Sequence, residues 1–250
     1  MSEPGEVKAL IFDVFGTCVD WRSGIAREAA AAAKAAGLSE EEFDALDFAT
    51  AWRSHYQPMM EPVRQGVRPW TILDQLHRES LDRILEDAGL GERFDEAARV
   101  DLTKAWWRLD PWPDVLPGLT RLKQGRFIAP CSNGNIALIA NMAKRAGLPW
   151  DLVLGAETAR AYKPNQEAYL RACEMLGLAP AEVAMVAAHN DDLFAARHAG
   201  LLCAFVPRPT EHGPGQTKDL EPLAGWDWVA TDFEDLARQG WGRAGLWGTG

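Results

Sequence analysis

The segment VKALIFDVFGT, residues 7 to 17, decides the fold of this chain of 250 residues. Its first part, Val7 to Val14, is almost continuously apolar and too short for a typical helix, and Gly16 follows it closely. A short apolar run of this kind is typical of a strand that is buried on both faces of a parallel sheet. Asp13 and Thr17 lie at its end, so the segment also predicts polar side chains at one edge of that sheet.

Residues 21–110 have a different pattern, in which apolar residues recur at helical spacing and strand signals are almost absent. A capping-box spacing between Ser39 and Glu42 predicts the start of a helix, and Pro58 or Pro62 is expected to end it. The expected helices cover residues 23–36, 39 to 58 or 62, 71–88 and 92–109. This stretch is therefore predicted to be a helical insertion.

Strand and helix patterns alternate from residue 111 onward. The expected strands are 126–131, 152–156, 183–188, 202–206 and 228–230, and the expected helices are 115–124, 135–146, 165–176 and 191–199. Such alternation indicates right-handed crossovers on a parallel sheet. The predicted fold class is α/β, a doubly wound parallel sheet whose first strand is followed by the helical insertion. Residues 207–222 are expected to form a surface loop rich in proline and glycine.

The charge balance narrows the classes of partner. Lysine and arginine number 26 against 36 acidic residues, which gives a net charge of −10. A nucleic-acid-binding protein needs basic surface to neutralise phosphates, and an anionic membrane likewise attracts basic segments. We therefore expect neither a nucleic-acid nor a membrane partner. Hydrophobic residues make up 47% of the chain, enough for a packed core.

Segments that direct or anchor a protein are not expected in this sequence. No apolar run approaches the roughly 18 residues that a bilayer-spanning helix needs, and the first residues, MSEPGE, lack the hydrophobic stretch of a signal peptide. The cysteines, which are dispersed without a Cys-x-x-Cys pair, are Cys18, Cys131, Cys173 and Cys203. Buried free thiols in a reducing cytoplasm are the expectation.

Polar groups follow several of the predicted strands. They are Asp13 with Thr17, Ser132-Asn133-Gly134, Lys163-Pro164, and His189 with Asp191 and Asp192. Each group alone has an ordinary structural explanation as a turn, a helix cap or a charge at a helix N-terminus. Ligands of doubly wound sheets bind beyond the carboxyl ends of the strands. Polar groups that recur at this edge in this order therefore predict a functional site.

The order of these motifs resembles that of the haloacid dehalogenase superfamily. The matching residues are Asp13-Val14-Phe15-Gly16-Thr17, Ser132-Asn133, Lys163-Pro164 and Asp192. The resemblance extends from about Val7 to Leu236. It implies a Rossmann-like core of residues 1–20 and 111–236, a helical cap domain of residues 21–110 inserted after the first strand, and a C-terminal tail of residues 237–250.

Most members of that superfamily are magnesium-dependent phosphatases, and two positions here depart from their pattern. Phe15 stands where those enzymes have an aspartate as general acid, and it can neither hold nor give a proton. Ala188 replaces an aspartate that helps to bind magnesium, which prefers several oxygen ligands. We therefore expect no metal and no cofactor. A magnesium-dependent phosphatase and a non-catalytic binding protein on this fold remain the alternatives.

The branch that the chain resembles is that of the type II 2-haloacid dehalogenases. The features that match are the aromatic Phe15, Trp52-Arg53 in the insertion, Ser132-Asn133-Gly134, and Tyr169 six residues after Lys163. This resemblance implies hydrolysis of short 2-haloalkanoic acids, such as L-2-haloacids and haloacetates, to 2-hydroxy acids with inversion. It implies a small haloacid substrate and a halide ion as partners, and it suggests a homodimer.

The resemblance and the chemistry together assign roles for the first half of such a reaction. Asp13 is expected to attack the carbon that bears the halogen and to form an aspartyl ester. Arg53 and Asn133 are expected to stabilise the departing halide by hydrogen bonds. Phe15 and Tyr169 are expected to complete the site that binds the substrate.

The remaining residues act on Asp13 or on its ester. Lys163 is expected to keep Asp13 ionised, since a nearby positive charge lowers the pKa of a carboxyl group. Thr17 and Ser132 are expected to orient the carboxylate oxygens. The resemblance implies that Asp192 positions or activates the water that hydrolyses the ester.

The fourth motif departs from the common dehalogenase pattern Ser-x-Asn-x-x-Asp. Ala187 stands in place of the serine and His189 in place of the asparagine. Two interpretations of His189 stay open. It acts as a general base, for which an imidazole with an unperturbed pKa of ~6.5 is suited, or it supplies a hydrogen bond in the role of the asparagine.

Overall fold

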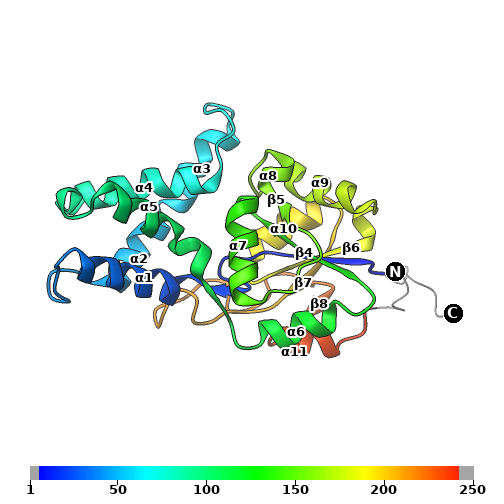
Figure 1. The fold of residues 1–250 in the computed structure, drawn as a ribbon. Helices are drawn as coiled ribbons and strands as arrows, with labels where there is room; N and C mark the ends of the chain where they lie inside the picture. The colour runs from blue at the N-terminus through cyan, green and yellow to red at the C-terminus, as the bar shows by residue number, and fades with distance from the viewer. Residues whose placement is uncertain (1–5, 242–250) are drawn as a thin grey trace.

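Six parallel strands form the central sheet of the computed structural model, which describes residues 6–241 (Figure 1). Their order is β5 (Leu154–Gly155), β4 (Phe127–Ser132), β1 (Ala9–Phe12), β6 (Val183–Ala187), β7 (Leu202–Phe205) and β8 (Trp228–Val229). β1 is central, since its Phe12 pairs with Pro130 of β4 on one side and with Val186 of β6 on the other. The predicted fold class, a doubly wound parallel sheet, is confirmed.

Helices on both faces of the sheet explain why the sequence of β1 is continuously apolar. Successive residues of a strand point to opposite faces. Leu10 and Phe12 belong to one core cluster, whereas Ala9 and Ile11 belong to the other. The helices of the first face are α6 (Val115–Leu122), α7 (Ile136–Ala146) and α11 (Phe233–Arg238), and those of the second are α9 (Gln166–Leu176) and α10 (Asn190–His198). The short α8 (Ala156–Ala159) contributes Ala156 to the first cluster and Ala159 to the second.

The helical insertion begins and ends at a small antiparallel ladder. β2 (Val19–Asp20) pairs with β3 (Asp110–Pro111), so the chain leaves the sheet and returns to it at one place. Between them lie α1 (Trp21–Ala35), α2 (Ala45–Ser54), α3 (Tyr56–Arg64), α4 (Leu73–Asp87), the 3-10 turn η1 (Gly91–Arg93), α5 (Glu96–Thr103) and the 3-10 turn η2 (Lys104–Arg108). Figure 1 shows these helices grouped on one side of the sheet.

The predicted start of the second helix was wrong. Glu42 does accept a hydrogen bond from the Ser39 backbone at 2.9 Å, but the chain forms a turn there, and α2 begins at Ala45. The Asp44 carboxylate caps α2 by accepting from two backbone N–H groups in its first turn. Phe43 packs on Phe48 across this start, with ring centroids 5.0 Å apart. This pair is a hydrophobic staple, which together with the cap fixes the helix start.

The prediction that proline ends this helix was also wrong. α2 ends at Ser54, before either proline, and both Pro58 and Pro62 lie within α3. Pro58 has no N–H to donate, and it lies in the first turn of α3, where N–H groups have no partner within the helix. The helix predicted over 92–109 is likewise divided into η1, α5 and η2, because Asp95 caps a new helix there by accepting from the Ala98 N–H.

The last described residues are packed on the core. Trp241 is buried, stacks on Trp228 at a centroid distance of 4.3 Å and donates to the Leu236 carbonyl. Most of the predicted tail, residues 242–250, lies outside the described residues. The cysteines are buried and unpaired, as expected. Within residues 6–241, no helix is both long and apolar enough to cross a bilayer.

Candidate active site

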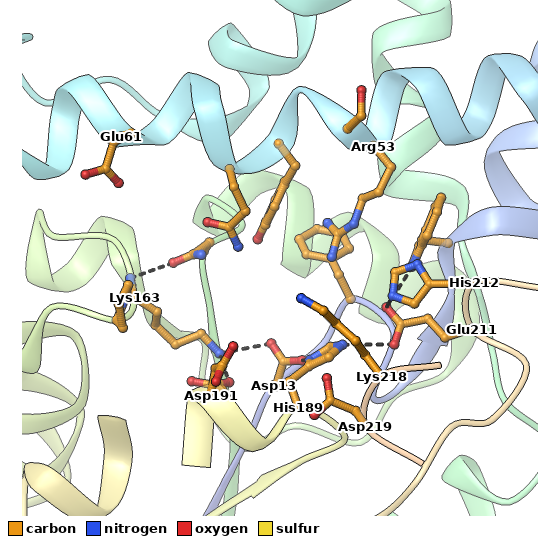
Figure 2. A pocket seen from close by; sticks show the side chains of 18 of the residues that line it. Asp13, Arg53, Glu61, Lys163, His189, Asp191, Glu211, His212, Lys218 and Asp219 are labelled. Carbon is orange, nitrogen blue, oxygen red and sulfur yellow. Dashed lines mark hydrogen bonds and ion pairs between the residues drawn. The ribbon is translucent and has the colours of Figure 1, made fainter. Parts of the chain in front are cut away.

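A pocket of about 770 Å³ lies beyond the carboxyl ends of the strands, between the sheet and the helical insertion (Figure 2). Of the predicted site residues, those that line it are Asp13, Phe15, Arg53, Asn133, Lys163, Tyr169, His189 and Asp192. Thr17 and Ser132 are fully buried beneath it. Figure 2 shows Arg53 facing Asp13, Lys163 and His189 across the pocket.

Asp13 is fixed at the end of β1 by the sheet itself. Its backbone N–H donates to the Val186 carbonyl at 3.0 Å, and its side chain is about nine-tenths buried. Oδ1 accepts from Lys163 Nζ at 2.9 Å, and Oδ2 accepts from Thr17 Oγ1 at 2.7 Å. Oδ2 also lies 3.1 Å from His189 Nδ1. Burial would raise the pKa of Asp13, but the Lys163 charge and the His189 and Thr17 hydrogen bonds hold it well below its ordinary value.

Lys163 joins the two carboxylates of the site. Its ammonium group is buried and lies 2.5 Å from Asp192 Oδ2 as well as 2.9 Å from Asp13 Oδ1. Burial alone would lower the pKa of Lys163, but the two carboxylates outweigh it and raise that pKa. The other oxygen of Asp192 accepts from the Tyr169 hydroxyl at 2.5 Å. Burial raises the pKa of Asp192 in spite of the Lys163 charge.

The two residues of the second motif have different positions. Asn133 lines the pocket, and its Oδ1 accepts from the Lys163 backbone N–H at 2.8 Å, which fixes its side-chain amide. The recorded hydrogen bond of the Ser132 hydroxyl within residues 6–241 is not with Asp13: it accepts from the Gly134 N–H at 3.0 Å and so shapes the turn. The predicted orienting contact is therefore made by Thr17 and not by Ser132.

Arg53 lines the pocket with a guanidinium group that is not fully hydrogen-bonded within the described residues. Its guanidinium carbon lies 4.0 Å from the ring centroid of Tyr56, 5.2 Å from that of Trp21 and 6.0 Å from that of Phe15. Its Nη1 is buried and has no hydrogen-bond partner among residues 6–241. Aromatic rings attract a cation that lies over their faces, but they do not accept ordinary hydrogen bonds from its N–H groups. The arrangement is suited to an anion that would accept from Arg53.

His189 lies between two carboxylates. Its Nδ1 is 3.1 Å from Asp13 Oδ2, and its Nε2 is 2.9 Å from Glu211 Oε2. An ionised carboxylate can only accept, so both ring nitrogens must donate and the ring is an imidazolium. Burial would lower the pKa of His189, but Glu211 and Asp13 raise it well above its ordinary value. An imidazolium has no lone pair with which to take a proton, so this geometry favours the hydrogen-bonding interpretation of His189.

Glu211 was missed by the sequence analysis. The predicted loop over 207–222 is confirmed, since the segment has no helix or strand and is largely exposed, but Arg208 and Glu211 within it are buried. Glu211 is 1% exposed and also accepts from Trp21 Nε1 at 2.9 Å. Arg208 holds this segment inward, since it donates to the Thr17 carbonyl and to both Asp114 oxygens. Other pocket residues that were missed include Tyr56, Gln57, Glu61, Arg64, His212, Lys218 and Asp219. No local pattern in the sequence distinguishes them.

One group of side chains has the composition of a metal site. Ligand atoms of His189, Glu211 and His212 lie within 4.8 Å of one another. A metal needs a lone pair on each imidazole, whereas both nitrogens of His189 donate to carboxylates. In this protonation state the cluster is a hydrogen-bonded ion pair and does not fit a metal ion.

The chain is similar to known proteins in sequence and in fold. A model of the haloacid dehalogenase-like hydrolase family matches residues 7–200. A solved defluorinating L-2-haloacid dehalogenase is 49% identical, with a TM-score of 0.90 over 92% of this chain and 94% of that one. A second solved L-2-haloacid dehalogenase is 46% identical, with a TM-score of 0.86 over 93% and 98%. An (S)-2-haloacid dehalogenase from Xanthobacter autotrophicus is 29% identical over 81% of this chain and 76% of that protein.

Proposed function

Because the chain belongs to the haloacid dehalogenase-like hydrolases, we propose that it hydrolyses short L-2-haloalkanoic acids to 2-hydroxy acids with inversion. The observation that carries this proposal is Asp13, an ionised carboxylate that opens into the pocket opposite Arg53, whose buried Nη1 has no hydrogen-bond partner among residues 6–241. A nucleophile on one side and an anion-binding group on the other are what displacement of a halide requires.

In the first half-reaction Asp13 attacks the carbon that bears the halogen. A carbon–oxygen bond forms, the carbon–halogen bond breaks and the halide leaves with the bonding pair. Arg53 and the amide of Asn133 receive the halide, and their hydrogen bonds strengthen as its charge develops. A halide needs no proton at departure, so the apolar Phe15 suits this chemistry. Lys163 keeps Asp13 ionised at neutral pH.

In the second half-reaction water attacks the carbonyl carbon of the Asp13 ester. Asp192 accepts a proton from this water, and its raised pKa suits that task. Tyr169 and Lys163 each hold one of its oxygens, which fixes the orientation of the base.

The wider organisation of the protein is part of the proposal. Helices α1–α5 act as a cap domain of residues 21–110 over a core of residues 1–20 and 111–236, on which Trp241 of the predicted tail of residues 237–250 also packs. The position of Arg53 on α2, across the pocket from Asp13, supports this division. The unpaired buried cysteines support a reducing, cytoplasmic location. A homodimer is proposed from the resemblance to the dehalogenases.

Asp13→Asn tests the nucleophile, because the amide cannot displace halide. We expect the wild-type protein to release chloride from L-2-chloropropionate and the variant to release none. Asp87→Asn, the same change at an exposed position at the end of α4, is the control. In a single turnover in ¹⁸O water with enzyme in excess, mass spectrometry should find the label in Asp13. Label that enters the hydroxy acid directly would show attack by water and refute the covalent route.

A further inference from the structure

The two oxygens of Asp13 are held unequally. Oδ2 receives two donors, Thr17 Oγ1 at 2.7 Å and His189 Nδ1 at 3.1 Å. Oδ1 receives Lys163 Nζ at 2.9 Å, its one recorded donor within the described chain. Each carboxylate oxygen has about two sites for accepted hydrogen bonds. Those of Oδ2 are occupied, so Oδ1 is the oxygen with a lone pair left to attack a substrate.

This asymmetry decides which atom carries charge in the second half-reaction. When Oδ1 bonds to the substrate carbon, Oδ2 becomes the carbonyl oxygen of the ester. Attack by water moves the carbonyl pair onto Oδ2, which then bears a full negative charge. Thr17 and His189 already point at that atom. Donors placed in advance where negative charge develops are an oxyanion hole.

Glu211 is built to keep His189 in the donating form. Its Oε2 lies 2.9 Å from Nε2, while Trp21 holds Oε1 at 2.9 Å. The carboxylate is almost fully buried, and it lies against Gly16 so closely that a Cβ there would meet Oε1 at 2.1 Å. Two carboxylates contact the His189 ring, those of Asp13 and Glu211. Once Asp13 is an ester, Glu211 alone of these two still carries a negative charge.

We propose that His189 and Thr17 form an oxyanion hole on Asp13 Oδ2 for ester hydrolysis, and that Glu211 is the positioning residue that keeps His189 a cationic donor. This inference rests on the proposed dehalogenation. Glu211 acts through His189 and touches neither substrate nor ester.

The step balances without a further reactant. The water oxygen bonds to the carbonyl carbon, and one water proton passes to Asp192. The electron pair of the carbonyl π bond moves to Oδ2. The pair then returns, the bond from carbon to Oδ1 breaks, and Oδ1 leaves in the product with the proton from Asp192. Asp13 is left as a carboxylic acid that holds the water oxygen, and it loses its remaining proton to solvent.

The pocket that His189 lines also carries charged and titratable groups from the other elements around it. They are Asp13 after β1, Arg53 on α2, Tyr56, Glu61 and Arg64 on α3, Lys163 before α9, Tyr169 on α9, Asp191 and Asp192 on α10, and Glu211, His212, Lys218 and Asp219 in the 207–222 segment. Within hydrogen-bond distance of the ring are Asp13 and Glu211. These two carboxylates therefore dominate its charge state.

The test is the pH dependence of ester hydrolysis itself. Enzyme is loaded with L-2-chloropropionate, quenched at intervals and assayed by mass spectrometry for ester on Asp13, with chloride release measured in parallel. His189 is a cationic donor only while both ring nitrogens are protonated, so hydrolysis should fall as pH rises through the pKa of His189. Glu211→Gln removes the charge that raises this pKa, so the fall should move to lower pH.

At neutral pH the Glu211→Gln ester should therefore decay about 10-fold more slowly, the difference between a charged and a neutral donor. The chloride burst that reports ester formation should remain. Glu174→Gln, the same change at an exposed position on α9, should behave as wild type. His189→Asn supplies a neutral amide donor, so the alkaline fall should disappear. Adding Glu211→Gln to that variant should then change nothing further, because Glu211 acts through the imidazolium.

Two results would overturn the inference while leaving dehalogenation intact. One is a rate of ester hydrolysis that increases with pH, with the midpoint of the increase shifted in Glu211→Gln. Such a profile would make His189 a general base. The other is a normal chloride burst with a pH profile that Glu211→Gln does not move. Should Glu211→Gln fail to fold, an alkaline fall that persists in His189→Asn refutes the inference by itself. A wild-type protein that releases no chloride and forms no ester would overturn the proposed function together with this inference.

Discussion

Lys163→Met removes the cation that joins Asp13 and Asp192 while keeping a long apolar side chain. In the folded protein the ammonium group is buried and lies 2.9 Å from one carboxylate and 2.5 Å from the other. The variant leaves two carboxylates close together in a buried site without this counter-charge. His189 and Tyr169 still donate to them, so the site retains part of its hydrogen bonding.

The size of the effect follows from these contacts. Breaking a buried ion pair by removing one partner costs about 3–5 kcal/mol, and one pKa unit corresponds to ~1.4 kcal/mol. Shared between two carboxylates, the loss should raise the pKa of Asp13 and that of Asp192 by about one to two units each. The free energy of unfolding at neutral pH should fall by about 3–5 kcal/mol.

How stability changes with pH follows from the direction in which the pKa of Asp13 is shifted. Its pKa is depressed in the folded protein, so the stabilisation is present above the unfolded pKa of ~3.9 and is lost as pH falls through the folded value. In Lys163→Met the pKa of Asp13 lies higher, so the nucleophile is protonated at a higher pH. The stability difference between the two proteins should narrow in acid, where protonation relieves the unpaired carboxylates.

Single-turnover chloride release, measured by quenched flow from acid to neutral pH, reports the ionisation of Asp13. We expect the acid limb of Lys163→Met to move upward by about one to two units, and urea unfolding should give the stability change. Lys218→Met is a matched control, because Lys218 lines the same pocket without an ion pair recorded in residues 6–241. If the acid limbs of Lys163→Met and wild type coincide, Lys163 does not control the charge of the nucleophile.

Two further predictions concern the leaving group and the metal. Arg53→Met should slow the chloride burst by about 10²–10³-fold, because the halide loses a donor that acts in the transition state; an unchanged burst in stopped flow would place halide stabilisation elsewhere. Chloride release should be unaffected by EDTA, because Phe15 and Ala188 stand where the phosphatases have their general acid and a metal ligand. A strict requirement for added magnesium would restore the phosphatase interpretation.

The sheet could be predicted from the sequence because its strands are short apolar runs between turns. The strand expected over 183–188 is β6 (Val183–Ala187), and that over 202–206 is β7 (Leu202–Phe205). Between residues 39 and 64 the boundaries were missed. Two N-cap residues compete there, Ser39 and Asp44, and the packing of Phe43 on Phe48 favours Asp44. Which residue caps the helix depends on contacts between side chains, and the spacing of apolar residues along the sequence does not reveal them.

The candidate site was predictable wherever its residues follow strands. Asp13 and Lys163 belong to motifs whose order places them at one edge of the sheet, and the structure brings them within 2.9 Å of each other. Glu211 lies in a segment without helix or strand, 22 residues after His189. Its position depends on Arg208, which reaches Thr17 and Asp114 from far along the chain. No local spacing encodes contacts of this range.

The charges of the site form an alternating row, and this row explains why one nucleophile can serve both half-reactions. Asp192, Lys163, Asp13, His189 and Glu211 follow one another at 2.5, 2.9, 3.1 and 2.9 Å. Esterification removes the central negative charge and leaves two cations facing a neutral carbonyl. Attack by water restores a negative charge at that place, so the surroundings suit the tetrahedral intermediate better than the ester. Interactions that are stronger in the transition state than in the ground state are those that accelerate a reaction. The same cations that keep Asp13 ionised for attack therefore also promote the breakdown of its ester.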